Sequence, residues 1–190
     1  MASLAPPCMP TLALRPARPD DALAVAELLI GVRRAFMPYA PLAHPDGDVR
    51  AWVQQHLLPS GGVSVLSEPA QPGTAPASPP GAAGARPAAA AAVMAVIATS
   101  DDGACRWIDQ MAVAPAWVSR GLGSRLLAHA LATLAPPVRL YTFQANTGAR
   151  RFYERHGFVA IASSDGQDNE EHCPDVLYER CRHPPPSTGA

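Results

Sequence analysis

The second half of the chain alternates between segments with strand character and segments with helical character. Trp107–Val113 and Arg139–Phe143 are predicted strands, and the apolar spacing of Gly121–Leu134 between them predicts a helix. Thr147–His156 predicts another helix, and Phe158–Ala162 predicts the strand that follows it. Because strands that alternate with helices pair partly in parallel, this order predicts an α/β domain with a mixed central sheet.

The rest of the chain adds elements of the same kind. A helix is expected to begin after Asp20 and Asp21, whose charges favour its positive end, and to extend to about Phe36. A second helix is expected to begin at Asp46 or Asp48 and to end before Pro59. The further expected strands are Leu12–Pro16, Val63–Leu66, Val93–Ala98 and Val176–Tyr178. The expected sheet therefore has about six to seven strands, flanked by helices.

A stretch rich in Pro and Ala interrupts the chain between two expected strands. Residues 68–91 are almost entirely Pro, Ala, Gly, Ser, Thr and Gln, which bury too little apolar surface to offset the entropy of ordering. We therefore predict one domain at 12–180, with a disordered insertion at 68–91 and disordered tails at 1–11 and 181–190. The insertion is expected to be dispensable, because the entropy of loop closure grows slowly with length.

The composition excludes several function classes. The 190 residues carry 15 Arg, no Lys and 16 acidic residues, and a net charge of −1 argues against nucleic-acid binding. No apolar run approaches the roughly 20 residues of a membrane span, and no secretory signal is recognisable, so a cytoplasmic protein is expected. No metal is predicted, because the only cluster of zinc-ligand types has the spacing of no standard finger; it comprises His172, Cys173, Cys181 and His183.

A glycine-containing loop precedes the helix predicted at Gly121–Leu134. Gly121 and Gly123 would let the backbone approach a ligand closely, and the free N–H groups of a helix start favour a phosphate. Arg120 adds positive charge. A tight turn explains the glycines equally well. A dinucleotide-binding fingerprint would need a third glycine where Leu126 stands, and the GK[ST] of a P-loop is absent.

Three further residues are candidates for chemistry. Asn146 and Tyr153 are seven residues apart, so two helical turns place them on nearly the same side. A helix N-cap and a packing tyrosine are the structural alternatives for these two. Asp109 alternates with Trp107 and Met111 and is therefore expected to share their face of a strand. A structural hydrogen-bond acceptor is its alternative role.

The stretches IDQMAVAP, SRGLGSRLL and YTFQANTGARRFYERHGF resemble the GNAT superfamily of acyl-CoA-dependent N-acyltransferases. The resemblance extends over 12–180 without the insertion. The family's loop pattern is Gln or Arg, two residues, Gly, one residue, then Gly or Ala. Val118, Gly121 and Gly123 occupy these positions, so Val118 departs from the pattern and only its backbone donor remains. The resemblance implies a single-domain GNAT-like fold that transfers an acetyl group from acetyl-CoA to a primary amine.

The resemblance also implies roles for individual residues. Tyr153 would protonate the departing CoA thiolate as general acid, and Asp109 would bind or deprotonate the acceptor amine. Asn146 would lie beside acetyl-CoA. The implied backbone contacts are Met111, Ala112 and Val113 for the pantetheine arm, and Ser119, Arg120, Gly121, Leu122, Gly123 and Ser124 for the pyrophosphate.

The implied acceptor is a small-molecule or peptide amine, with no nucleic acid, membrane or metal involved, and a homodimer stays open. The acidic residues of 165–171 are either a solvated loop or a means of attracting a cationic amine. Two other functions stay open: a non-catalytic acyl-CoA-binding sensor or interaction module of the same fold, and a nucleotide-binding α/β protein.

Overall fold

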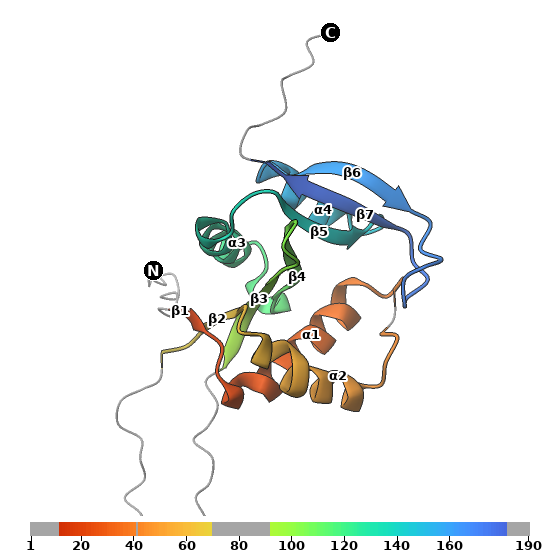
Figure 1. Cartoon of the computed structure of the whole chain (residues 1–190). Coiled ribbons are helices and arrows are strands. Elements are labelled where there is room, and N and C mark those ends of the chain that lie inside the picture. Colours follow the sequence, from red (N-terminus) through yellow and green to blue (C-terminus); the bar gives the residue numbers. More distant parts are fainter. Residues whose placement is uncertain (1–11, 41, 70–91, 182–190) are drawn as a thin grey trace, which may run out of the picture.

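A computed structural model describes residues 12–40, 42–69 and 92–181 of the chain. These residues form one seven-stranded mixed sheet with four α-helices packed against its two faces (Figure 1). The expected α/β class with six to seven strands is thereby confirmed. The predicted tails, apart from Cys181, and nearly all of the predicted insertion lie outside the described residues, as does His183.

The elements follow one another closely as the sequence predicts. In chain order they are β1 (Ala13–Pro16), the 3₁₀ turn η1 (Pro19–Asp21), α1 (Ala22–Phe36), α2 (Asp46–Trp52), β2 (Val63–Ser67), β3 (Val93–Asp101), β4 (Arg106–Val113), α3 (Leu122–Thr133), β5 (Val138–Phe143), α4 (Thr147–Arg155), β6 (Val159–Ser164) and β7 (Asp175–Arg180). The expected second helix continues beyond α2 as a π turn, η2 (Val53–Leu57), and a 3₁₀ turn, η3 (Leu58–Ser60). A further 3₁₀ turn, η4 (Pro115–Trp117), precedes α3.

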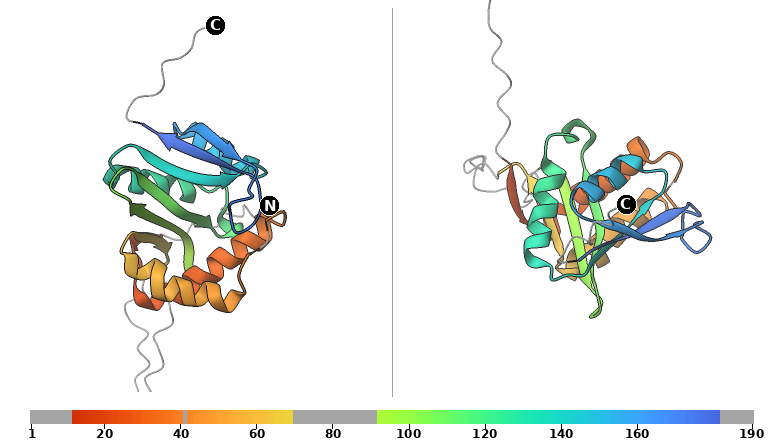
Figure 2. Two further views of the ribbon diagram at one scale, coloured as in Figure 1. Left: turned by 45° about the vertical axis from the view of Figure 1, so that its right-hand side comes forward. Right: turned by 90° about the horizontal axis from the view of Figure 1, so that it is seen from above.

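The strands lie in the order β1-β2-β3-β4-β5-β7-β6. Every neighbouring pair is antiparallel except β4 and β5, which α3 connects by a crossover. The helices α1 and α2 cover one face of the sheet, and α3 and α4 cover the other (Figures 1 and 2). The single parallel pair therefore lies between two otherwise antiparallel halves of the sheet.

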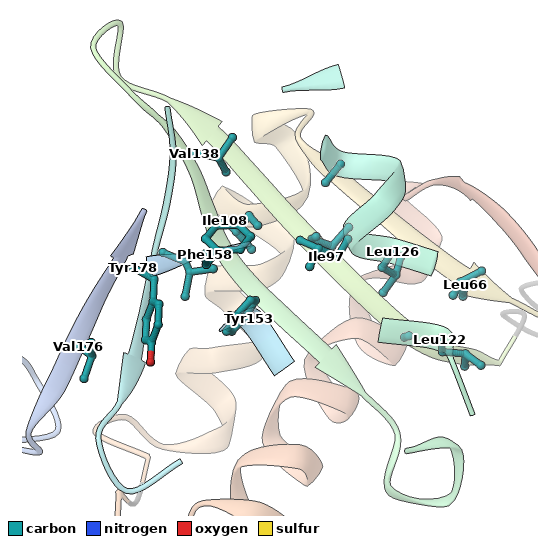
Figure 3. Packing of buried hydrophobic residues seen from close by; sticks show 14 of the residues in the cluster. Leu66, Ile97, Ile108, Leu122, Leu126, Val138, Tyr153, Phe158, Val176 and Tyr178 are labelled. Carbon is teal, nitrogen blue, oxygen red and sulfur yellow. The ribbon is translucent and has the colours of Figure 1, made fainter. Parts of the chain in front are cut away.

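Each face of the sheet has its own core. The face beneath α3 and α4 buries large aliphatic and aromatic side chains, among them Ile97, Leu126, Phe158 and Tyr178 (Figure 3). The face beneath α1 buries smaller side chains, mostly Val and Ala. Because side chains alternate along a strand, β3 supplies both cores and is buried on both faces, which makes it the centre of the fold.

Two boundaries differ slightly from the prediction. The Glu68 backbone N–H donates to the Ala92 carbonyl at 3.3 Å, so the β2–β3 ladder continues one residue into the predicted insertion. The Cys181 thiol, placed in the predicted tail, donates to Glu179 at 3.1 Å. Because β2 and β3 pair antiparallel, the predicted insertion connects two adjacent strands of the sheet.

A buried ion pair fixes the start of α1 against the sheet. Asp21 is 3% exposed, and its carboxylate accepts hydrogen bonds from both terminal nitrogens of Arg15, at 2.6 and 2.8 Å. It also accepts the Arg18 backbone N–H at 2.7 Å. The hydrogen bonds from Arg15, aided by that of Arg18, hold the pKa of Asp21 below its ordinary value. The ionised carboxylate is therefore the form that the fold requires.

We expect Asp21→Ala to lower the free energy of unfolding by about 3 kcal/mol at pH 7, because it leaves a partly buried guanidinium unpaired. Because the pKa of Asp21 is lowered in the folded state, the ion pair stabilises the fold fully at pH values above the unfolded aspartate pKa of about 3.9. This stabilisation is lost as the pH falls through the pKa of Asp21 in the folded state. Urea unfolding at neutral and acid pH measures both effects. Asp20→Ala, a change to the exposed neighbour in the same turn, is the control; an equal loss from Asp20→Ala would contradict the assignment.

Candidate active site

The strands β4 and β5 separate soon after they begin. Their parallel pairing is limited to Arg106 with Val138 and Trp107 with Arg139, although both strands continue well beyond these residues. The register between β3 and β4 shifts between Ala98 and Thr99, which leaves Asp109 as an extra residue in β4. Such a bulge bends its strand and increases the local twist. The bulge and the separation together open a gap in the middle of the sheet.

The second half of β4 presents backbone groups to this gap. Ala114 donates its N–H to Met94 of β3 at 2.8 Å, and hydrogen-bonded positions alternate in an antiparallel pair. The register therefore directs the N–H and C=O groups of Met111 and Val113 away from β3, toward the gap that β5 has left. Ala112, predicted to contact pantetheine with its neighbours, is directed toward β3 instead. Two of the three predicted backbone positions can thus receive a ligand.

The bulge also changes the predicted faces of β4. Ile108 and Met111 both pack on the α3/α4 side, although they are three residues apart. Asp109 accepts a hydrogen bond from Ser100, the cross-strand partner of Trp107, at 2.9 Å. Asp109 therefore shares a face with Trp107 but not with Met111. The prediction that all three share one face is wrong, because the extra residue reverses the alternation beyond it.

The phenol of Tyr153 is the buried polar group that projects toward this gap from α4. The residue is 7% exposed and packs edge-to-face against Phe158 (Figure 3). It makes a second edge-to-face contact with Phe152. The Tyr153 hydroxyl has no hydrogen-bond partner among the described residues. In those residues, every fully buried side-chain oxygen or nitrogen does have a partner. The hydroxyl must therefore reach open space. Burial raises the pKa of Tyr153 well above its ordinary value, so the hydroxyl stays protonated at neutral pH.

Polar contacts at its start and along its length hold α4, and with it Tyr153, in place. Asn146 is the N-cap, and its side-chain oxygen accepts the Ala149 N–H at 3.1 Å. Arg150 donates to the Tyr178 hydroxyl at 3.2 Å, and that hydroxyl donates to Glu154 at 2.7 Å. The capping alternative for Asn146 is therefore confirmed. The side chain also lines the open space described below.

The environment of Asp109 differs from that of the other surface carboxylates. Desolvation raises the pKa of Asp109 above its ordinary value, although the Ser100 hydroxyl opposes this shift. A raised pKa makes a carboxylate a stronger base once it is ionised. Asp109 therefore combines a position beside the gap with the electrostatics expected of a group that takes a proton.

The loop before α3 has the geometry of an anion site. Ser119 and Gly121 have φ angles of 63° and 81°, a left-handed conformation that is rare for a serine. Gly121 is the N-cap of α3 and supplies no side chain, so the first N–H groups of the helix keep their hydrogen-bonding capacity. A Cβ atom on Gly121 would enter open space, whereas one on Gly123 would lie 3.4 Å from Phe152 of α4. Gly121 thus suits a ligand, and Gly123 also serves helix packing.

Sequence reasoning missed a contact that orders this loop. The guanidinium of Arg120 lies over the Trp117 ring, 5.2 Å from its centroid. The stack holds Arg120 beside the start of α3, where its charge complements an anion. An aromatic residue three positions before an arginine is a weak signal, so only the folded turn η4 reveals this pair.

A cleft of about 1020 Å³ lies between the separated strands and brings five of the twelve predicted site residues together. Asp109, Met111, Ala112, Asn146 and Tyr153 all line it. Val113 and the loop 119–124 lie outside its lining. The opposite wall comes from α1, α2 and the β6–β7 connection. Sequence reasoning missed its residues from α1 and α2, such as Arg33 and Trp52, whereas Asp168 is one of the acidic residues that it named as a means of attracting a cationic amine. These residues carry no recognisable motif, and only the fold brings them beside β4.

Two polar contacts, Arg33–Glu171 and His44–Glu170, join the α1–α2 part of this wall to its β6–β7 part. Arg33 donates to Glu171 at 2.5 Å, and its guanidinium lies over Phe143, 5.1 Å from the ring centroid. His44 lies 3.1 Å from Glu170. The α1–α2 connection is thereby held against the β6–β7 connection at the mouth of the cleft. The residues that the structure describes contain no group of three or more His, Cys, Asp or Glu able to hold a metal ion.

Comparison with known proteins decides the family. The model of the acetyltransferase (GNAT) family matches residues 31–158, which contain the bulge, the loop, Asn146 and Tyr153. The chain belongs to the GNAT family of acetyltransferases. A comparison with the curated proteins found no match.

Solved structures of GNAT proteins share its fold. A GNAT acetyltransferase from Bacillus cereus is 14% identical with a TM-score of 0.63, over 91% of this chain and 99% of that one. The PaiA N-acetyltransferase from Thermoplasma acidophilum, solved with coenzyme A, is 13% identical with a TM-score of 0.60, over 90% and 99%. NAA60 from Arabidopsis thaliana, solved with a bisubstrate analogue, is 15% identical with a TM-score of 0.58, over 90% and 98%. At these identities the likeness concerns the fold.

The protein is therefore an acetyltransferase, as the resemblance implies. Among the described residues, no helix of this acetyltransferase is long and apolar enough to cross a membrane.

Proposed function

We propose that this GNAT protein transfers the acetyl group of acetyl-CoA to a primary amine by direct attack in a ternary complex. The observation that carries the proposal is the protonated hydroxyl of Tyr153, which opens into the gap between β4 and β5 and has no hydrogen-bond partner among the described residues. A phenol that keeps its proton and faces the cleft can donate that proton to a leaving group, which favours a catalytic role. A non-catalytic binding module would gain nothing from such a group.

Acetyl-CoA would lie along the side of the gap that the β4 backbone and the α3 loop provide. The pyrophosphate would bind the N–H groups at Ser119–Ser124, beside the charge of Arg120. The pantetheine arm would use the gap-facing backbone of Met111 and Val113, with Asn146 beside it. Open space at Gly121, an uncapped helix start and unpaired strand backbone all fit this co-substrate.

Asp109 and Tyr153 would divide the proton transfers of the proposed reaction between them. The acceptor enters as an ammonium and loses one proton, which Asp109 takes directly or through water. The free amine attacks the thioester carbon, a C–N bond forms, and a backbone N–H of β4 stabilises the oxyanion. The C–S bond then breaks, and Tyr153 protonates the thiolate. The proton lost from nitrogen as the amide forms restores the phenol. Holding both reactants in one cleft supplies further acceleration.

A panel of primary amines with acetyl-CoA tests the proposal. We expect CoA release above the hydrolysis background with at least one amine, and a product mass increased by one acetyl group. CoA binding without acetylation of any amine, small molecule or peptide, would favour the non-catalytic alternative. Binding of ATP without binding of CoA would favour the nucleotide-binding alternative.

A further inference from the structure

We propose that the acceptor is an aliphatic amine that carries a second positive charge, which the carboxylates at the mouth of the cleft recognise. The inference rests on the proposed function and names its substrate class. Diamines and longer polyamines have this chemistry: a methylene chain with an ammonium group at each end.

The charge of the cleft differs sharply from that of the whole chain. Six carboxylates line it, and among the residues that the structure describes one arginine and one histidine are the only basic residues that do. The whole chain has a net charge of −1, so this concentration of negative charge is local. The six are Asp48, Asp109, Asp168, Glu170, Glu171 and Asp175. A cleft lined by one sign of charge raises the local concentration of the opposite ion.

Apart from Asp109, two of these carboxylates are available to a ligand, since Asp175 accepts hydrogen bonds from Ser164 and Asn169. Glu171 pairs with Arg33, and Glu170 lies beside His44. Asp48 and Asp168 have no side-chain partner among the residues that the structure describes. Asp48 belongs to α2 and Asp168 to the β6–β7 connection, on the wall opposite β4. A cation held by either carboxylate would therefore lie across the cleft from Asp109 of β4.

The unpartnered hydroxyl of Tyr153 independently marks the reacting end of the same cleft. Asp109 lines that end as well, where it would hold the amine that is acetylated. One ammonium is thus expected beside Asp109 and Tyr153, and the other at the carboxylates of the mouth. Two separated cation positions in one cleft fit a molecule with two charges better than a simple amine.

Apolar side chains on the opposite wall suit the chain between the two charges. Leu29 and Val49 line the cleft, and so does Trp52, which is 40% exposed. An exposed tryptophan provides apolar contact for methylene groups, and its ring face attracts an ammonium. A methylene chain needs only such apolar contact, whereas each amide group of a peptide would also need a hydrogen-bond partner.

The test compares amines of equal carbon count that differ only in the second charge. We expect kcat/KM for putrescine to exceed that for butylamine by at least about 10-fold at low salt, and the ratio to fall as salt screens the carboxylates. The same comparison of cadaverine with pentylamine varies the chain length. Equal kcat/KM values within both pairs, or a neutral peptide preferred over both diamines, would overturn the inference.

Variants separate recognition of the second charge from catalysis. Asp48→Asn with Asp168→Asn should raise KM for putrescine about 10-fold, with KM for butylamine and for acetyl-CoA unchanged. Asp165→Asn, in the same connection as Asp168 but outside the cleft lining, is the matched control. An unchanged putrescine KM in the double variant would also overturn the inference. Failure of the proposed function looks different, because no amine would then be acetylated.

Discussion

Tyr153→Phe should reduce kcat by about 10²–10⁴-fold and leave the affinity for acetyl-CoA nearly unchanged, because removal of a general acid typically costs that much. The substitution deletes only the hydroxyl. The ring contacts with Phe152 and Phe158 remain, and no hydrogen bond to a described residue is lost. The fold should therefore be intact, which circular dichroism and thermal unfolding can verify. Tyr39→Phe, a change to a tyrosine outside the cleft lining, is the control.

The pH dependence adds a second readout. Because burial raises the pKa of Tyr153, the phenol keeps its proton beyond the ordinary tyrosine pKa of about 10. Loss of this proton should therefore cause no fall in kcat below about pH 10. The raised pKa of Asp109 predicts that kcat falls on the acid side at a pH above the ordinary aspartate value, because the base must be ionised to act. An unchanged kcat for Tyr153→Phe would remove this residue from the mechanism.

Gly121→Val should weaken CoA binding by about 100-fold. The φ angle of 81° disfavours any side chain, and a β-branched one most, so the loop would lose the geometry that presents its N–H groups. The side chain would also enter the open space beside the start of α3. Loss of two hydrogen bonds to a charged group, at roughly 1.5 kcal/mol each, corresponds to that factor. Isothermal titration calorimetry with CoA measures it.

A second glycine provides the matched control. Gly103, in the turn between β3 and β4, has a φ angle of 85°, and a Cβ atom there would also meet open space. Gly103→Val should therefore cost similar stability but leave CoA affinity unchanged. Equal affinity in both variants would contradict the assignment of the pyrophosphate to this loop. Gly123 is a poorer test, because a larger side chain there would press against Phe152 and disturb α3–α4 packing.

Local sequence was sufficient to predict nearly all elements of this acetyltransferase. The expected helix at Gly121–Leu134 is α3 at Leu122–Thr133, and the expected strand at Arg139–Phe143 is β5 at Val138–Phe143. Apolar periodicity, helix caps and proline stops act within a few residues, so they are visible in the chain itself. The seven-residue spacing likewise predicted that Asn146 and Tyr153 lie on nearly the same side of one helix. Asn146 is the N-cap of α4 and Tyr153 lies within it, and both line the cleft.

Long-range pairing decided the rest, and no local pattern encodes it. The extra residue at Asp109 is defined only by the register of β4 against β3, and it reversed the expected face of Met111. The gap exists because β5 leaves β4 after two paired residues, which depends on how each strand packs against its own helices. The carboxylates Asp48 and Asp168 are 120 positions apart in sequence and meet at one cleft only through the fold. The sequence by itself thus determined the elements, the helix that carries Tyr153 and the acidic run at 165–171, whereas tertiary packing created the cleft and brought Asp48 of α2 to the same mouth.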